Sequence, residues 1–183
     1  MSTIRQARAA DAAALADLAA ATFALACPPD VNLVAVAAHV RSVLAVEHFA
    51  QHLADPTHLI LVAEDQSAHD DGAAPELAGF TMLVFAESED ADVLASTSIR
   101  PAVEISKFYL RAGSHGTGLA GELMTAALQA ARERGSAGAW LGVYEFNVRA
   151  QRFYIKHGFA TVGTKFFRFD GQNETDLVLE RAL

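Results

Sequence analysis

The sequence predicts an α/β protein with a mixed, twisted sheet flanked by helices. Two stretches carry this prediction. The first is an apolar, strand-like run from Val103 to Leu110 that enters a glycine-rich turn and leaves it as an alanine- and leucine-rich helical run. The second is the apolar run Trp140–Tyr144, which leads into a helical stretch that ends at Gly158. Strands that alternate with helices indicate a sheet covered by helices. With 183 residues, of which 52% are hydrophobic, we expect a single domain over residues 1–183.

The N-terminal part of the chain predicts a strand, a group of helices and a hairpin. Asp11 is the expected N-cap of an alanine-rich helix, because its short polar side chain can accept the first free amides. That helix is expected to end before Cys27-Pro28-Pro29, since proline has no N–H to continue it. The remaining elements expected here are a strand at Thr3–Ala7, one or two helices in Asp30–Leu53, and strands at His58–Glu64 and Leu77–Glu87 joined by the polar loop Asp65–Glu76.

The C-terminal part predicts a loop and then two strand–helix units. Ser88–Pro101 has an irregular composition and is expected to be a loop. Asn147 is a good cap for the second helix, on which Ala150, Phe153 and Tyr154 lie at helical spacing on one face. Gly158 is expected to end that helix. Two closing strands are expected near Phe159–Phe169 and Glu174–Glu180.

The turn after Leu110 has the features of a phosphate-binding cradle. Glycine lets the backbone approach a ligand closely, and the first free N–H groups of a helix attract an anion. No Lys-Ser or Lys-Thr follows these glycines, which excludes a P-loop. Gly116, Gly118 and Gly121 match the Rossmann spacing, but this turn lies late in the chain, where little sheet can follow. A plain glycine loop without a ligand is the alternative.

Both stretches resemble motifs of the GNAT acetyltransferase superfamily. His115-Gly116-Thr117-Gly118-Leu119-Ala120 resembles motif A, Gln/Arg-x-x-Gly-x-Gly/Ala. Asn147, Ala150, Phe153-Tyr154 and Gly158-Phe159 resemble motif B, and the two occur in the family's order. The likeness covers the chain from about residue 77 to its end. Glu-Ile-x-x-x-Tyr, Trp-Leu-Gly-Val-Tyr-Glu and Thr-Asp-Leu-Val-Leu look most like bacterial polyamine-type (spermidine/spermine) N-acetyltransferases.

The resemblance implies a fold, a co-substrate and a set of binding residues. The fold is a mostly antiparallel sheet of about six or seven strands, splayed between the strands of motifs A and B. The co-substrate is acetyl-CoA, whose pantetheine arm lies in the gap between those strands. The residues implied to bind it are Phe108, Tyr109 and Leu110 through their backbone, His115, Gly116, Thr117, Gly118, Leu119 and Ala120 at the pyrophosphate, and Asn147 and Tyr154 along the arm.

His115 departs from the family pattern, which has Gln or Arg at this position. A neutral imidazole can still donate a hydrogen bond to a phosphate, but it carries less charge than Arg. We therefore expect the backbone donors of the turn to supply most of the binding, and the affinity for CoA to be weaker and to rise as the pH falls.

Two residues are candidates for proton transfer. Tyr154 is the expected general acid, because a phenol is protonated at neutral pH and can donate to a departing thiolate. Glu104 is the expected general base, since it lies between Val103 and Ile105 and partial burial raises the pKa of a carboxylate. The alternatives are a Tyr154 that only packs and binds cofactor, and a Glu104 that is solvated or paired. Other family members place the base two residues later, which is Ser106 here, and Glu145 is the second candidate.

A histidine pair and the cysteine could suggest a metal site or a nucleophile, but structural roles explain them better. His48 and His52 share a helix face, but the Glu of the zinc-protease motif and a third ligand are missing, so we expect a solvated face and no metal. Cys27 lacks a nearby basic partner, so a core thiol explains it better than a nucleophile.

Composition limits the partners and the location. The net charge of −8 argues against nucleic acid and suits a cationic substrate. No run reaches 18 apolar residues and the N-terminus lacks a signal-peptide core, so we expect no membrane partner. Cys27 is the single cysteine, so we expect the protein in the reducing cytoplasm.

Three functions are compatible with the sequence. The first is an acetyl-CoA-dependent N-acetyltransferase that modifies the primary amine of a small, polyamine-like molecule by direct attack in a ternary complex. The second is a non-catalytic acyl-CoA sensor, and the third is a protein or peptide N-acetyltransferase. The presence of both Tyr154 and Glu104 favours an enzyme. Dimerisation is common in the family, so a homodimer is compatible with the resemblance.

Overall fold

The protein is built on one continuous sheet. A computed structural model describes residues 2–26, 32–65, 76–114, 116–169 and 171–183. Within these ranges the sheet has seven strands in the order β1-β2-β3-β4-β5-β7-β6. Every neighbouring pair is antiparallel except β4 and β5, which confirms the mixed, mostly antiparallel sheet. The strands are β1 (Ser2–Gln6), β2 (His58–Asp65), β3 (Glu76–Val84), β4 (Ala102–Leu110), β5 (Gly138–Tyr144), β6 (Ala160–Phe169) and β7 (Gln172–Ala182).

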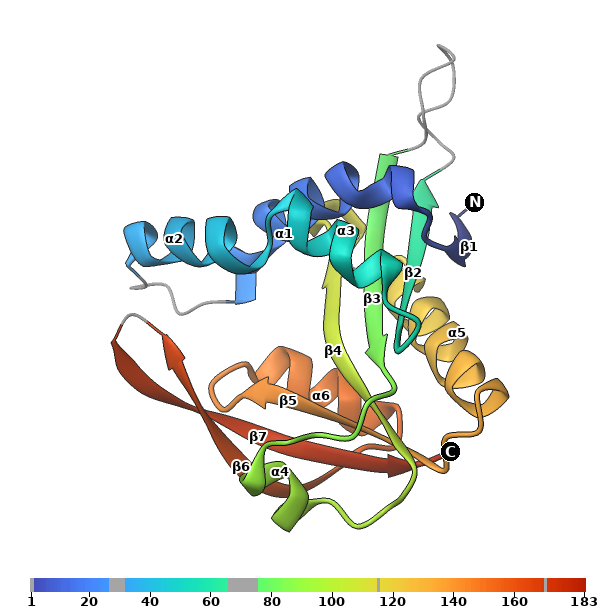
Figure 1. The fold of residues 1–183 in the computed structure, drawn as a ribbon, viewed down its shortest axis with the longest axis vertical. Helices are drawn as coiled ribbons and strands as arrows, with labels where there is room; N and C mark the ends of the chain where they lie inside the picture. The colour runs from blue at the N-terminus through green and yellow to red at the C-terminus, as the bar shows by residue number, and fades with distance from the viewer. Residues whose placement is uncertain (1, 27–31, 66–75, 115, 170) are drawn as a thin grey trace.

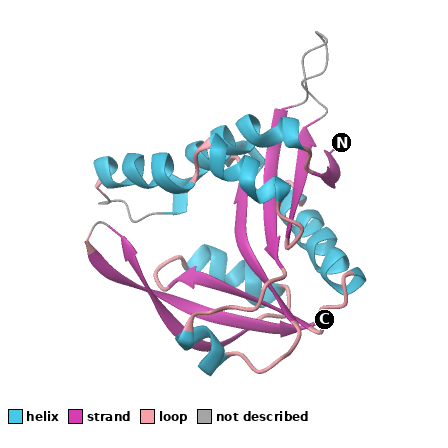
Figure 2. Cartoon of the chain, in the orientation of Figure 1, coloured by secondary structure: helices cyan, strands magenta, loops and turns pink. Residues whose placement is uncertain are grey.

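Helices cover both sides of this sheet (Figure 1). On one side lie the helices that precede β2, and on the other lies the long helix between β4 and β5; Figure 2 shows the two helical layers against the strands. The helices are α1 (Ala12–Ala26), α2 (Leu33–Val43), α3 (Val46–Ala54), α4 (Ala91–Ser96), α5 (Leu119–Glu133) and α6 (Val148–Lys156), with short 3-10 turns η1 (Ala9–Asp11) and η3 (Ala112–Ser114).

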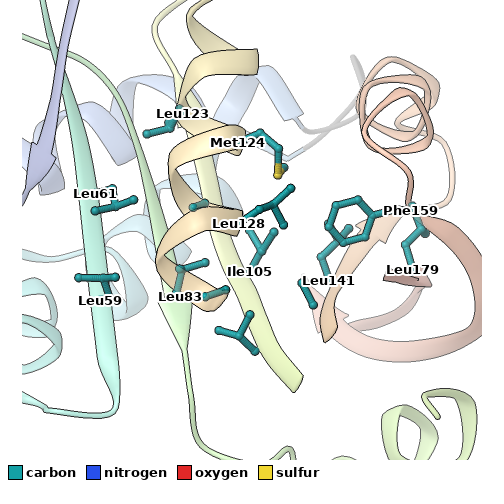
Figure 3. Packing of buried hydrophobic residues seen from close by; sticks show 14 of the residues in the cluster. Leu59, Leu61, Leu83, Ile105, Leu123, Met124, Leu128, Leu141, Phe159 and Leu179 are labelled. Carbon is teal, nitrogen blue, oxygen red and sulfur yellow. The ribbon is translucent and has the colours of Figure 1, made fainter. Parts of the chain in front are cut away.

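Strand alternation divides the core into two clusters. Ile60, Val62, Phe80 and Met82 pack against α1 and α3, and we call their side of the sheet the α1–α3 face. The intervening side chains of the same strands point the other way and pack against α5; we call that side the α5 face. The α5 cluster continues across β4, β5 and β7, as Figure 3 shows for Leu59, Leu61, Leu83, Ile105, Leu123, Met124, Leu128, Leu141, Phe159 and Leu179.

The sheet is split between its two halves. β4 and β5 are paired only at their first residues, through Ala102↔Gly138, Val103↔Ala139 and Glu104↔Trp140. Beyond these pairs β4 stays paired with β3 up to Leu110, and β5 stays paired with β7 up to Tyr144. The two strands therefore diverge, as Figure 1 shows, and the predicted splay is confirmed.

A bulge in β4 lies at the start of this split. Met82 of β3 is opposite Lys107, whereas the next residue, Leu83, is opposite Ile105, so Ser106 is an extra residue in β4. A bulge of this kind bends its strand and increases the local twist. β4 therefore turns away from β5 directly after Glu104, the last residue that pairs with β5.

Two local predictions were wrong. Ser88–Pro101 is not a plain loop, because it contains α4, whose N-cap Asp90 accepts hydrogen bonds from the amides of Asp92 and Val93. The segment after α4 is held by the buried Glu180, whose carboxylate accepts the amides of Ser98 and Ile99. Asp11 precedes α1 as expected, but it lies in η1, and its carboxylate accepts hydrogen bonds from the Arg8 amide and the Arg5 guanidinium.

The segment Leu33–Ala54 is long and apolar enough, by length and composition, to cross a membrane. The structure divides it into α2 and α3, with a break at Leu44 and Ala45 where the backbone leaves the helical conformation. Phe49 of α3 is fully buried and its ring lies 5.5 Å from that of Phe80 in the sheet. α3 thus packs in the core, and the two helices confirm the one or two that the sequence predicted for this region.

Phe49→Ala should lower the free energy of unfolding by about 3–5 kcal/mol, because a buried aromatic ring is lost and a cavity remains. Urea denaturation followed by circular dichroism measures the change. Leu33→Ala is the matched control: Leu33 is 72% exposed, so its loss should change stability by about 0.5 kcal/mol or less. Equal effects of the two substitutions would contradict the assignment of α3 to the core.

Candidate active site

The backbone edge of β4 beyond the split faces an open gap. The amide of Arg111 donates a hydrogen bond to the carbonyl of Ala78 in β3. In an antiparallel pair the backbone groups of every second residue point to the same neighbour, so the N–H and C=O groups of Tyr109, two residues earlier, also point to β3. Tyr109 is one of these residues, and its backbone belongs to the β3 ladder. The N–H and C=O groups of Phe108 and Leu110 point to the other side, into the gap. Of the three residues predicted to offer backbone to the pantetheine arm, Phe108 and Leu110 fit that role and Tyr109 does not.

The bulge decides which side chains of β4 lie on which face. Val103 and Ile105 pack in the α5 cluster, and so does Phe108, although regular alternation would place it on the opposite side from Ile105. Tyr109 packs with the cluster under α1 and α3. The alternation therefore changes phase at Ser106, and Glu104, Lys107 and Tyr109 all lie on the α1–α3 face.

The glycine turn opens onto the start of α5. Gly116 and Gly118 have positive φ angles of 82° and 92°, and Gly118 is the N-cap of α5. A side chain added at either glycine would meet no atom within 4 Å, so the space in front of the turn is open. The hydroxyl of Thr117 donates to the carbonyl of Ser114 and braces the turn. Free helix amides in front of an open space suit a pyrophosphate, so the predicted cradle fits this co-substrate.

A pocket of about 590 Å³ lies beside this turn. It extends from Gly118 along the first turns of α5 and is closed on one side by His157, at the end of α6. The Nδ1 atom of His157 lies 2.8 Å from the carbonyl oxygen of Phe153, and its Nε2 atom lies 3.8 Å from the place of a Cβ at Gly121. The sequence analysis did not single out His157. The pocket is lined by Gly118, Gly121, Glu122, Thr125, Ala126, Gln129 and His157.

Asn147 has the structural role that was predicted for it. Its Oδ1 atom accepts the amide of Ala150 at 3.1 Å and caps α6. The cap fixes the direction of α6 at the open end of β5, where the gap is widest. The amide nitrogen of the same side chain remains able to donate, which is what the predicted contact with the pantetheine arm requires.

Tyr154 lies on the α5 face of the gap. Its ring packs against Phe108, at 6.3 Å between ring centroids, and against Phe153 and Phe159. Burial raises the pKa of the Tyr154 phenol above its usual value, with a smaller contribution from Tyr109. The phenol is therefore protonated throughout the physiological range, as a proton donor must be.

Glu104 lies on the opposite face, at the last residue pair before the split. It is half-buried, and burial raises the pKa of its carboxyl, against the opposing effects of Lys165, Lys107 and the Ser106 hydroxyl. A carboxylate with a raised pKa is a stronger base at neutral pH. The predicted partial burial of Glu104 is thus present in the structure.

Lys107 was missed in the sequence. It is a half-buried lysine in the middle of an apolar strand, and desolvation lowers its pKa while Glu104 raises it. The signal in the sequence was a cation inside the run Glu104–Leu110, which regular alternation would have assigned to the opposite face from Glu104.

A second carboxylate, Asp176 of β7, also lies on the α1–α3 side of the sheet. It is opposite Tyr144 of β5 and Lys165 of β6. A Cβ at Gly142 would lie 3.0 Å from its Oδ2 atom and 2.8 Å from Cε of Lys165, so the absence of a side chain at Gly142 makes room for both groups. Burial raises the pKa of Asp176 to about 6, against the opposing charge of Lys165. It is the Asp of Thr-Asp-Leu-Val-Leu, to which the sequence assigned no role.

The other candidates lie outside this group or have a different role. Glu145 is exposed in the turn after β5, so it is a weaker candidate base than Glu104. His52 does not lie on a solvated face: its ring stacks on His58 at 4.8 Å, and burial lowers its pKa to about 4.

Within the described ranges no group of three or more His, Cys, Asp or Glu residues could hold a metal ion. Cys27 and His115 lie outside the described residues.

A mostly antiparallel sheet that splits between two parallel strands, with a glycine turn at the start of the following helix, is the fold that the resemblance to GNAT acetyltransferases implies. The family model described as Acetyltransferase (GNAT) family matches residues 34–159. The chain belongs to this family.

Relatives and solved structures agree with this assignment. Uncharacterized N-acetyltransferases of Mycobacterium tuberculosis and Mycobacterium bovis are each 41% identical to this chain over 173 residues, covering 94% of this chain and 98% of the relative. The family and these relatives make the protein an acetyl-CoA-dependent N-acetyltransferase.

Among solved structures, the fold is similar to the PaiA N-acetyltransferase of Thermoplasma acidophilum in complex with coenzyme A, with a TM-score of 0.76, 18% identity and coverage of 100% and 99% of the two chains. A ribosomal-protein alanine N-acetyltransferase of Escherichia coli gives a TM-score of 0.68 at 15% identity, covering 100% and 94%. Nourseothricin acetyltransferase gives 0.53 at 26% identity, covering 70% and 66%. The fold itself is thus shared by enzymes whose names describe very different acceptors.

Gly118→Val should weaken CoA binding by about tenfold or more, because a branched side chain would occupy the space in front of the turn. Isothermal titration calorimetry measures the affinity. Gly135→Val is the matched control: Gly135 also has a positive φ, 83°, and open space around it, but it lies at the far end of α5. Both variants carry the same backbone strain. Equal loss of affinity in the two would contradict the cradle.

Proposed function

We propose that this protein transfers the acetyl group of acetyl-CoA to the primary amine of a small molecule, by direct attack within a ternary complex. The placement of Glu104 and Tyr154 carries the proposal. Glu104 lies on the α1–α3 face of the gap, and Tyr154 packs against Phe108 on the α5 face. An amine that attacks a thioester and the sulfur that leaves it need a base and an acid on different sides of the reacting carbon.

The residues have distinct tasks in this reaction. Phe108 and Leu110 offer backbone groups to the pantetheine arm, and the turn at Gly118 receives the pyrophosphate. Glu104 accepts the proton that the amine loses as the N–C bond forms. Tyr154 donates its proton to the sulfur as the C–S bond breaks, and CoA leaves as the free thiol together with the acetylated amine. When bound, acetyl-CoA supplies the activated acyl group, and the protein supplies alignment and the two proton transfers.

The type of acceptor is part of the proposal. The resemblance of the sequence to polyamine-type enzymes supports a short aliphatic amine over a polypeptide, and a polyamine itself stays a prediction. A release assay for free CoA thiol distinguishes the alternatives: small amines should give steady turnover, peptides should give none, and a sensor would bind acetyl-CoA without any release. We also propose a cytoplasmic location, because a chain with a single cysteine is typical of a reducing compartment.

Tyr154→Phe should lower kcat by about 10²–10⁴-fold, because the ring and its packing remain while the proton donor is lost. The dissociation constant of acetyl-CoA, measured by calorimetry, should change little. A solvent isotope effect or single-turnover kinetics establishes that chemistry limits the rate. A kcat close to that of the wild type under these conditions would remove Tyr154 from the role of acid.

Glu104→Gln should lower kcat/KM at neutral pH by about 10²–10⁴-fold. A base acts in its deprotonated form, so the wild-type rate should rise with pH through the raised pKa of Glu104 and then level off. The Gln variant should lose this acidic limb and recover partly at high pH, where the amine deprotonates without help.

Asp176→Asn is the matched control for this experiment, because Asp176 is the other carboxyl with a raised pKa on the same side of the sheet. It should leave the acidic limb in place. If Asp176→Asn removes the limb and Glu104→Gln preserves it, the base is Asp176.

A further inference from the structure

The charged groups beside Glu104 indicate the chemical class of the acceptor, if the proposed function is correct. The bulge at Ser106 brings Glu104 and Lys107 onto one face of β4. In the register with β3, Glu104 is opposite Val84 and Lys107 is opposite Met82. Val84 and Met82 are two residues apart, so the backbone positions of Glu104 and Lys107 are about 7 Å apart, as residues i and i+2 of a regular strand are. A carboxylate and an ammonium group thus lie on the same face of β4, at the start of the split.

Glu104 is the anion whose charge acts on Lys107, and no ion pair between the two side chains is formed. Lys107 forms no ion pair with any side chain in the described part of the chain. The charge of Lys107 also acts on His39 of α2 and His52 of α3. Burial and the charge of Lys107 lower the pKa of both imidazoles, so they are neutral and can accept or donate hydrogen bonds without compensating the charge.

A half-buried, unpaired ammonium group is costly unless something pairs with it. Most lysine side chains are exposed to water at the protein surface. Lys107 instead lies under α2 and α3, beside the carboxylate that takes the amine proton. The simplest way to compensate its charge during the reaction is an anionic group on the acceptor itself.

We propose that the acceptor is a zwitterion, an amino-acid-like molecule that carries a carboxylate a few bonds from its primary amine. Lys107 binds the carboxylate while the amine lies at Glu104. The spacing of about 7 Å between the two strand positions suits a molecule with one to four carbon atoms between these groups. The second cation of a polyamine would instead meet Lys107, and two like charges in a partly buried site repel each other.

This assignment reverses what the net charge suggests. The chain as a whole carries a charge of −8, which suits a cationic substrate. On the α1–α3 side of the sheet, however, Glu104 and Asp176 are balanced by Lys107 and Lys165. Local charges act at a few ångströms, whereas charges farther than about 10 Å apart are screened, so the local balance determines which acceptor fits.

The test is a matched acceptor panel assayed with acetyl-CoA by CoA release. It contains α-, β- and γ-amino acids, the methyl ester of each, the corresponding amines without a carboxylate, and a linear polyamine. The wild type should acetylate one or more of the amino acids with a kcat/KM about 10–100-fold above that of its ester, the range expected for a hydrogen bond to a charged group. A preference for the polyamine or equal rates with acid and ester would overturn the proposal, and neither result affects the proposed function.

Lys107→Met keeps the unbranched apolar stem of the side chain and removes the charged end. It should raise KM for the preferred amino acid about 10–100-fold, leave its kcat and the affinity for acetyl-CoA nearly unchanged, and leave the ester unaffected. Lys156→Met is the control, since Lys156 is exposed on α6. If Lys107→Met lowers the rate with acid and ester equally, the residue is structural and the proposal is wrong. If no panel member is acetylated while acetyl-CoA binds, the small-molecule function fails and this proposal fails with it.

Discussion

The structure depends on the short pairing between β4 and β5. Three residue pairs hold the two halves of the sheet together, and beyond Glu104 each strand keeps only one partner. Unpaired backbone groups in the middle of a sheet are unfavourable unless something else bonds to them. The bulge at Ser106 bends β4, and the rings of Phe108, Phe153 and Tyr154 fill one side of the gap. What remains is a slot with backbone donors and acceptors at its edge, which an extended polar chain such as the pantetheine arm can complete.

This split also separates the chemistry into two sides. The α5 face carries the glycine turn, the pocket closed by His157 and the phenol of Tyr154, all of which suit the co-substrate. The α1–α3 side carries the charged groups that suit an acceptor. Side chains of a strand alternate between faces, so one short segment of β4 contributes to both sides: Phe108 packs under Tyr154, while its neighbours Lys107 and Tyr109 face the helices α1–α3.

The α1–α3 side of the sheet carries groups from distant parts of the chain. α2 and α3 supply His39 and His52, β7 supplies Asp176, and α4 covers Trp140 through Val93. A pocket of about 230 Å³ lies between α4 and the start of β4 and is lined in part by Ala102 and by Trp140, the residue that pairs with Glu104. A closed, partly apolar setting of this kind raises the pKa of carboxyl groups and strengthens charge pairing, which is the common cause of the shifts at Glu104 and Asp176.

The sequence by itself determined the elements whose signals are local. The strand, turn and helix around Gly118, the Asn147 cap and the end of α6 at Gly158 follow from backbone preferences within a few residues, and the structure confirms them. α4 was missed because its signal is a single cap and one buried valine in a short segment.

Tertiary structure decided the rest. The phase of β4 after the bulge depends on its register with β3, and no periodicity in the strand itself reports an extra residue. Lys107 therefore came to the same face as Glu104, and the backbone of Tyr109 turned toward β3. Asp176 became part of the site for a similar reason, because its neighbours Tyr144 and Lys165 are brought beside it only by strand pairing.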